Sequence, residues 1–288
     1  MKKTTILAAV ALLALALTSC TRKTFCIYDA MHYQGKPASL LEDKLSPVTL
    51  IYEAFLIGED TQLDMAKVDA RIKDIQASGI NTISTDIEEW YESRTGEEMK
   101  AGFTELFDRF KEAIPGCNVG NYGVPVSDLN VLRYTTSMKG KPEKEIIARW
   151  KSDSKNRFPV AEVSDVLYPS LYAMNPDMKQ FAKDVKTTAQ FIRKNFPGKK
   201  VIGYIWPQYY NLKYNPYYQK FISPEDWRAV LEACYKYLDG VVIWAHGRDE
   251  DNKTYVKWSD SRVQAMYEVT KEFISEHSDN IVTDIAGE

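Results

Sequence analysis

Short apolar runs alternate with amphipathic stretches along most of this chain. The runs that predict strands cover residues 48–55, 82–90, 118–124, 165–173, 201–206 and 240–246. Between two of these runs, Met65, Val68, Ile72 and Ile75 recur at helical spacing ahead of Gly79, a residue type that commonly ends helices. Strands that alternate with helices in this way predict βα units around a parallel sheet.

The other helical stretches predict the same architecture. Apolar residues keep a helical period over 103–110 and 178–196, and Ser223 followed by Pro224 is typical of a helix start. The polar stretch 127–156 predicts long loops with a short helix near 143–150. Six strands are visible where a regular barrel has eight. The fold class expected is therefore α/β, a single irregular (β/α) TIM-like barrel.

The N-terminal segment predicts export and not a part of the fold. Lys2 and Lys3 precede an apolar run over 6–17, which ends in Leu17-Thr18-Ser19-Cys20 and resembles the lipobox of bacterial lipoproteins. The run is too short to cross a bilayer as a helix. We therefore expect a signal peptide over 1–20, lipidation at Cys20, and a protein held in the bacterial cell envelope, on the periplasmic side or at the cell surface, through its lipid anchor only.

The remaining residues divide into three parts in this interpretation. Residues 21–47 would form a tether and lead-in, 48–276 the barrel domain, and 277–288 a C-terminal tail. The chain has 288 residues and 44% hydrophobic content, and one large core fits this length better than two small domains.

Composition excludes several classes of function. The formal net charge of −3 leaves no electrostatic footprint for nucleic acid. No glycine-rich phosphate loop follows a strand, and no cysteines and histidines stand at zinc-binding spacing, so we expect neither a cofactor nor a metal. With only His32, His246 and His277 present, a serine or cysteine triad has few bases. The 18 tyrosines and 6 tryptophans fit either an ordinary core and surface or a sugar-binding cleft.

Two carboxylates stand two residues apart where a strand is predicted to end. Side chains alternate along a strand, so Asp86 and Glu88 would point one way and Glu89 the other. In a βα barrel this end of the strand carries the active site. In a shared desolvated pocket, ionised Asp86 would raise the pKa of Glu88 and keep its proton available for general acid catalysis. The alternative is a solvated strand end with an ion-paired carboxylate.

The segment from Ser84 to Trp90 resembles the Asp-Trp-Glu-Glu-Trp signature of the hyaluronidases of glycoside hydrolase family 56. Four more segments are similar to that family in the same chain order: Gly120-Asn121-Tyr122-Gly123-Val124-Pro125, Leu167-Tyr168-Pro169-Ser170-Leu171-Tyr172, Val201-Ile202-Gly203-Tyr204 and Gly240-Val241-Val242-Ile243-Trp244. The five segments span about residues 82 to 247, and each lies on a strand predicted independently of the resemblance.

The resemblance implies a retaining endo-glycosidase acting on a polysaccharide that contains N-acetylhexosamine, such as hyaluronan or chondroitin. In such enzymes the N-acetyl oxygen of the substrate attacks the anomeric carbon. Glu88 would then be the general acid and base, and Asp86 would orient the N-acetyl group. The sugar-binding positions carried over residue by residue are Tyr122, Tyr172, Tyr204 and Trp244, although Tyr204 and Trp244 also fit as aromatics that fill the barrel.

Several departures from the family leave the substrate open. The central Trp of the signature is Ile87 here, and Tyr91 stands where the family often has an Arg. Hyaluronan and chondroitin carry a charge on every second sugar, and an enzyme for them usually has a basic groove. The scattered basic residues that folding would have to gather are Arg133, Lys139, Lys141 and Arg157.

Two other interpretations remain open. One is a lipid-anchored glycan-binding protein of the same fold that has no turnover. The other is a glycosidase in which Asp86 itself attacks the sugar. The kinetics of a Glu88→Gln variant distinguish a hydrolase from a binding protein. Inhibition by N-acetylglucosamine thiazoline, a mimic of the cyclised intermediate, distinguishes substrate assistance from direct attack.

Overall fold

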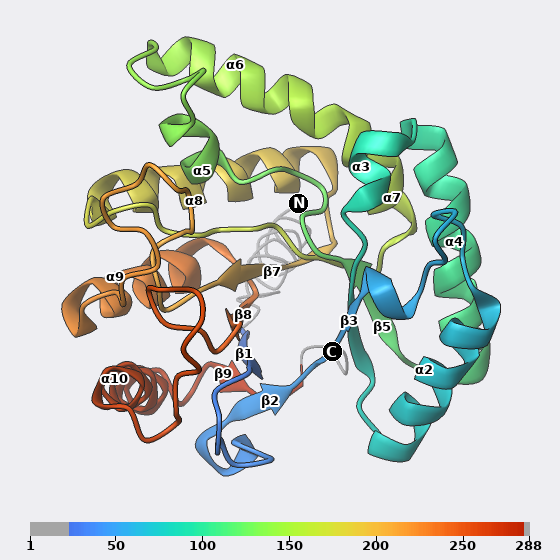
Figure 1. The fold of residues 1–288 in the computed structure, drawn as a ribbon, viewed down its shortest axis with the longest axis horizontal. Coiled ribbons are helices and arrows are strands. Elements are labelled where there is room, and N and C mark those ends of the chain that lie inside the picture. The colour runs from blue at the N-terminus through green and yellow to red at the C-terminus, as the bar shows by residue number, and fades with distance from the viewer. Residues whose placement is uncertain (1–22, 285–288) are drawn as a thin grey trace, which may run out of the picture.

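Parallel strands form the centre of the molecule and helices pack around them (Figure 1). The computed structural model describes residues 23–284. One sheet has the strand order β2 (Leu45–Pro47), β1 (Phe25–Met31), β8 (Gly240–Ala245), β7 (Lys200–Ile205) and β6 (Val166–Leu167), and the short β9 (Ile281–Val282) also pairs with β1. The other sheet has the order β3 (Thr49–Tyr52), β4 (Thr82–Asp86) and β5 (Asn118–Asn121). All of these strand pairs are parallel.

The two sheets join at both edges. At one edge Val48 alone separates β2, which pairs with β1, from β3, which pairs with β4. At the other edge Tyr122, just after β5, bridges to Tyr168, just after β6, and the Asp165 N–H donates to the Val119 carbonyl at 2.8 Å. The described part of the chain thus forms an irregular barrel in which β2 and β3 share one position. The predicted α/β barrel class is confirmed.

The helices cover the outside of the barrel, and some of them begin or end where the sequence predicts, although the stretch 127–156, predicted as loops with one short helix near 143–150, forms two helices. The side chain of Asp64 caps the first turn of one helix by accepting from the N–H groups of Ala66 and Lys67, and Gly79 ends that helix with a φ of 70°. Ser223 caps another, accepting from the Asp226 N–H. The helices are α2 (Met65–Ser78), α3 (Glu89–Ser93), α4 (Gly96–Ala113), α5 (Leu129–Tyr134), α6 (Glu143–Ser154), α7 (Phe158–Val163), α8 (Met178–Asn195), α9 (Pro224–Tyr237) and α10 (Ser261–Glu276).

The barrel begins earlier and ends later than the sequence analysis placed it. Strand β1 lies inside the segment 21–47 that was assigned to a tether, and it sits between β2 and β8 with nearly all of its side chains buried. A strand buried on both faces shows no polar alternation, so Phe25–Met31 lacks the period of a half-buried strand. Strand β9, in the predicted tail 277–288, pairs with the start of β1, so the fold extends to residue 282.

Several predicted strands are shorter in the structure, and 48–55 and 118–124 keep only Thr49–Tyr52 and Asn118–Asn121 as strands. The run 82–90 ends as a strand at Asp86, and a helix begins at Glu89. The run 165–173 keeps only Val166–Leu167 as a strand, with single bridges at Tyr168 and Ser170. Proline has no N–H to donate, so Pro169 interrupts the ladder between these bridges.

The predicted signal peptide 1–20 and the lipidation site Cys20 lie outside the described residues. Within 23–284 no helix is long and apolar enough to cross a bilayer. In the same range Cys26, Cys117 and Cys234 are buried free thiols. No group of three His, Cys, Asp or Glu side chains there is placed to hold a metal ion.

Candidate active site

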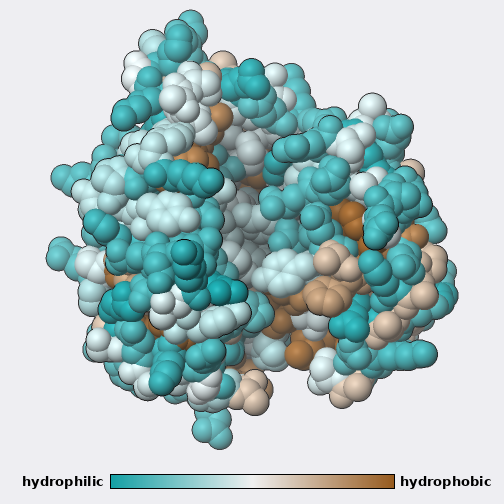
Figure 2. All heavy atoms as spheres, viewed as in Figure 1, coloured by the Kyte–Doolittle hydropathy of each residue, from teal (hydrophilic) through white to brown (hydrophobic). Residues whose placement is uncertain are grey.

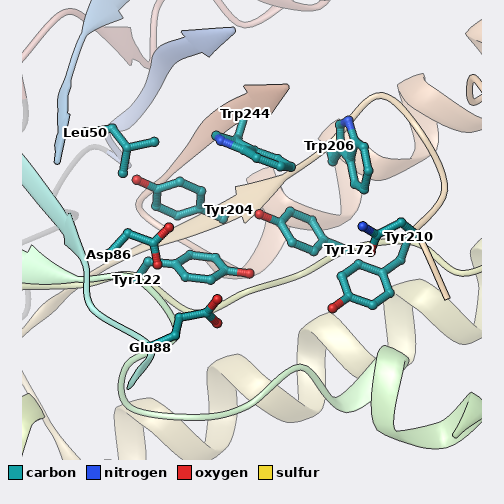
Figure 3. A pocket seen from close by; sticks show the side chains of 10 residues that line it. Leu50, Asp86, Glu88, Tyr122, Tyr172, Tyr204, Trp206, Tyr210 and Trp244 are labelled. Atoms are coloured by element: carbon teal, nitrogen blue, oxygen red, sulfur yellow. The ribbon is translucent and has the colours of Figure 1, made fainter. Parts of the chain in front are cut away.

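The six candidate site residues meet in one cavity of about 190 Å³ near the C-terminal ends of the strands (Figure 3). Asp86 ends β4, Glu88 precedes α3, and Tyr204 and Trp244 lie in β7 and β8. Figure 3 shows Asp86 and Glu88 reaching into the cavity from one side, with the two tryptophans Trp206 and Trp244 across from them and tyrosine rings between. The full lining is Leu50, Asp86, Glu88, Tyr122, Tyr172, Tyr204, Trp206, Tyr210, Asn211 and Trp244.

Backbone hydrogen bonds fix the turn that carries the two carboxyl groups. The side-chain oxygen of Asn121 accepts from the Ile87 N–H at 3.1 Å and from the Thr85 hydroxyl at 2.7 Å. One carboxylate oxygen of Glu53 accepts from the N–H groups of Glu88 at 3.0 Å and Glu89 at 3.1 Å. Glu88 therefore reaches the cavity because the chain turns there after Asp86, and not through strand alternation as predicted.

Desolvation raises the pKa of both carboxyl groups. Burial, followed by the negative charges of Glu88 and Glu53, raises the pKa of Asp86 to about 7. Desolvation also raises the pKa of Glu88, with a contribution from Glu53, although the Arg157 guanidinium opposes this shift. The sequence predicts that the charge of Asp86 raises the Glu88 pKa, but the charges that raise it in the structure are those of Glu53 and Glu92. Desolvation is the largest cause of the shift for each group, even though part of Glu88 remains exposed to solvent.

One oxygen of Asp86 has no internal partner. Oδ1 is buried and accepts no hydrogen bond within the described residues. A buried acceptor without a donor costs about 1–3 kcal/mol. Asp86 lines the cavity, so this unused acceptor belongs to a side chain that borders the space a ligand would occupy.

Aromatic rings form the walls of the cavity. The rings of Tyr122 and Tyr172 stack with centroids 6.2 Å apart, and the edge of Tyr204 meets Tyr122 at 5.0 Å. Trp244 lies 6.0 Å from Tyr172, and its indole N–H donates to the Tyr52 hydroxyl at 3.0 Å. This packing holds the rings in place before any ligand binds.

Tyr122 is further positioned through Ser170. The Tyr122 hydroxyl donates to Ser170 Oγ at 3.2 Å, and the Ser170 hydroxyl donates to Asp128 Oδ2 at 3.1 Å. The same Asp128 oxygen accepts from the Tyr172 N–H at 2.6 Å, and burial raises the Asp128 pKa to about 7. One carboxyl group thus supports two tyrosines of the cavity.

The structure adds lining residues that the sequence does not single out, Leu50, Trp206 and Tyr210. Asn211, which also lines the cavity, begins the stretch 211–218 that the sequence offers as either a subsite platform or a surface turn. Trp206 directly follows β7, and a rule that strand ends carry the site would have found it. Tyr210 stacks on Tyr172, with centroids 5.7 Å apart and planes at 19°, but it comes from a loop whose path only the folded chain sets. Tyr168 is fully buried and does not line the cavity.

Two neighbouring cavities extend this one into a groove. A cavity of about 330 Å³ shares Glu88, Tyr122 and Tyr210 with it, and a third of about 600 Å³ shares Leu50. Figure 2 shows a hollow in this face of the molecule, between α5 and α6 on one side and α3 on the other (compare Figure 1).

The barrel has counterparts among solved structures. Bee venom hyaluronidase superposes with a TM-score of 0.53 at 14% identity, over 88% of this chain and 97% of that chain. Bee venom hyaluronidase in complex with a hyaluronic acid tetramer gives 0.52 at 17% identity, over 87% and 96%. No protein-family model matches the sequence, and no curated protein matches it. At these identities the likeness establishes the fold, an α/β barrel of the kind that bee venom hyaluronidase has.

Proposed function

We propose that this protein is a glycoside hydrolase that cleaves within polysaccharides containing N-acetylhexosamine and retains the anomeric configuration. The observation that supports this most is the pair Asp86 and Glu88, two carboxyl groups of raised pKa in one cavity walled by tyrosine and tryptophan. A structural ion pair would instead keep a carboxyl pKa low. The shared fold with a hyaluronidase that binds a hyaluronic acid tetramer agrees with the proposal.

The cavity matches the groups of an acetamido sugar. The amide N–H of the sugar would donate to Asp86 Oδ1, which has no partner in the protein, and the acetyl methyl would pack on Trp244. A hydrogen bond to the ionised form lowers a carboxyl pKa. Substrate binding would therefore lower the pKa of Asp86 and leave the proton of the pair on Glu88, where acid catalysis needs it.

Bond cleavage then follows by substrate assistance. The acetyl carbonyl oxygen attacks the anomeric carbon, Glu88 donates its proton to the leaving glycosidic oxygen, and a cyclic oxazolinium ion forms. Ionised Asp86 stabilises the positive charge that develops on the ring. A water molecule next attacks the anomeric carbon, and Glu88 accepts a proton from this water. The oxazolinium ring then reopens to the acetamide. Two inversions at the same carbon leave the configuration retained.

The first test measures the release of reducing ends from hyaluronan, chondroitin and a panel of glycans rich in N-acetylglucosamine. We expect Glu88→Gln to lower kcat by about a thousandfold or more, since general acid catalysis and the charge it handles are both lost. Ligand affinity should stay within about threefold. Glu89→Gln is the matched control, because Glu89 is the exposed neighbour and lines none of the three cavities.

Two outcomes would redirect the proposal. If no glycan is cleaved but the wild type and the Glu88→Gln variant both bind a glycan, the protein is a glycan-binding module. If cleavage occurs and N-acetylglucosamine thiazoline does not inhibit it, Asp86 acts as the nucleophile and the substrate-assisted step is wrong.

A further inference from the structure

A cavity of about 870 Å³ lies at the end of the barrel opposite the groove. It opens where three neighbouring strands begin: Lys23 precedes β1, Lys200 starts β7 and Asp239 precedes β8. The C-terminal halves of α8 and α9 complete its wall. Because the strands are parallel, this end of the barrel is the one away from Asp86.

The lining of this cavity carries an excess of positive charge. Its cationic side chains are Lys23, Arg193, Lys200 and Lys236, and its carboxyl group is Asp239. Four positive charges against one negative charge leave a net of three positive charges. The whole chain has a formal net charge of −3, so the excess is local to this end of the barrel.

Both oxygens of Asp239 already accept hydrogen bonds. Oδ1 accepts from the Arg193 guanidinium at 3.1 Å, and Oδ2 accepts from the Val201 N–H at 2.8 Å. Arg193 also donates to the Tyr237 carbonyl at 3.3 Å, at the end of α9, where a cation complements the helix dipole. Contacts within the fold therefore account for Asp239 and Arg193, but not for the three lysines.

The three lysines of the cavity have no acidic partner. Among residues 23–284, no carboxylate forms an ion pair with Lys23, Lys200 or Lys236. Burial lowers the pKa of Lys23, although the charges of Asp239 and Glu232 oppose this shift. An anion bound in the cavity would supply the missing negative charge.

Aromatic rings hold two of these lysines in place. The Nζ atom of Lys23 lies 3.9 Å from the centre of the Tyr235 ring, and that of Lys236 lies 5.6 Å from the centre of the Tyr237 ring. An ammonium group has three N–H donors, and a ring occupies one side of the group. The other donors remain available to oxygen atoms of a ligand.

The position of the cavity indicates which anion it would meet. Lys23 follows the predicted lipidation site Cys20 by three residues, and three residues span at most about 10 Å. Charges interact over about this distance at moderate salt. A lipid on Cys20 would therefore bring Lys23 within range of the phosphates of the membrane that holds the lipid.

We propose that the cavity binds the phosphate of an anionic phospholipid headgroup and holds the barrel on the membrane with the groove facing away. The lysines would donate charge-assisted hydrogen bonds to the phosphate oxygens. Basic side chains beside a lipid anchor strengthen attachment to anionic membranes. The proposal does not depend on the proposed function, because none of the three lysines lines the groove.

The test measures how fast single lysines react with a water-soluble acetylating ester. The processed protein, as the cell makes it, is mixed with phosphatidylcholine vesicles or with vesicles that contain about one third phosphatidylglycerol, and trace labelling is quantified by mass spectrometry. At low salt we expect Lys23, Lys200 and Lys236 to react at least about threefold more slowly on the anionic vesicles. About 0.5 M salt should abolish this difference. Lys144, exposed on α6 beside the groove, should react equally on both.

Removing two charges of the cavity checks the cause. The double variant Lys200→Gln, Lys236→Gln keeps most of each side chain and should reduce the protection of Lys23 to less than about 1.5-fold. The matched control is Lys139→Gln, Lys144→Gln. This variant makes the same charge change at two exposed lysines outside the cavity, and protection of Lys23 should stay as in the wild type.

Three results would overturn the proposal. The first is equal reactivity of the three lysines on neutral and anionic vesicles at low salt. The second is full protection of Lys23 in the cavity double variant, which would mean that other residues contact the membrane. The third is equal protection by inorganic phosphate without vesicles, which would make the cavity a site for a soluble anion. Glycan cleavage enters none of these measurements, so the proposed function stands or falls separately.

Discussion

Glu53 influences the site in two ways through a single carboxylate. One of its oxygens accepts from the backbone N–H groups of Glu88 and Glu89, which fixes the start of α3. Its negative charge also raises the pKa of Asp86 and of Glu88. The position of the turn and the pKa values of Asp86 and Glu88 therefore both depend on Glu53. This side chain comes from a different βα unit than the two candidate catalytic residues.

A Glu53→Gln variant separates these two effects. Glutamine keeps an oxygen that accepts from the two N–H groups, but it removes the negative charge. Without that charge the ionised forms of Asp86 and Glu88 become easier to reach, so both pKa values fall. Glu88 then loses its proton at a lower pH, and the alkaline limb of the kcat/KM profile should shift down by about half a unit to one unit.

The control for this pH profile is Glu59→Gln. Glu59 is exposed and does not contribute to the pKa shift of either group, so its profile should match the wild type. An unchanged alkaline limb in Glu53→Gln would show that Glu53 acts on this turn through its hydrogen bonds alone.

At the scale of elements, the sequence predicted the barrel class and most helices because their apolar periodicity and caps are local signals. It missed β1 because that strand is buried on both faces and follows a segment interpreted as a leader. The site was predicted in part: Asp86, Glu88 and the aromatic positions carry recognisable local motifs. Tyr210 and Glu53 lack such a signal, because loops and contacts between separate βα units place them.

The closure of the barrel between β5 and β6 depends on Gly120. A Cβ atom at this position would lie 2.1 Å from the Val166 carbonyl oxygen and 3.0 Å from the Tyr168 ring. Backbone cannot yield as a flexible side chain can, so the two strands would have to separate. We expect Gly120→Ala to lower the free energy of unfolding by about 3 kcal/mol or more, measured by urea denaturation.

Gly58→Ala is the matched control for that measurement. The nearest atom to its added Cβ, at 2.9 Å, belongs to the carboxylate of exposed Asp60, which can rotate away. A loss within about 1 kcal/mol is expected there. If Gly120→Ala unfolds at the same urea concentration as the control, the close approach of β5 and β6 is not needed for stability.

At the scale of the whole molecule, the groove and the start of the described chain lie at opposite ends of the barrel. The strands are parallel, so the C-terminal end of β4, where Asp86 lies, is the end away from the first residue of β1. Lys23, two residues before β1, lies 3.9 Å from the centre of the Tyr235 ring. An anchor attached just before this point would hold the face opposite the groove and leave the groove open to long polymers.

The predicted anchor at Cys20 can be tested on this basis. Cys20→Ser should abolish labelling by an alkyne fatty acid and move the protein from the membrane fraction to the soluble fraction, because serine provides no thiol for the lipid. Its kcat/KM on a soluble polymer should stay unchanged, since the groove faces away from the anchored end. Cys117→Ser, which replaces a buried thiol of the barrel, should keep both labelling and membrane association. Labelling that persists in Cys20→Ser would contradict the lipoprotein prediction. A large loss of kcat/KM in the released protein would show instead that activity depends on the anchor.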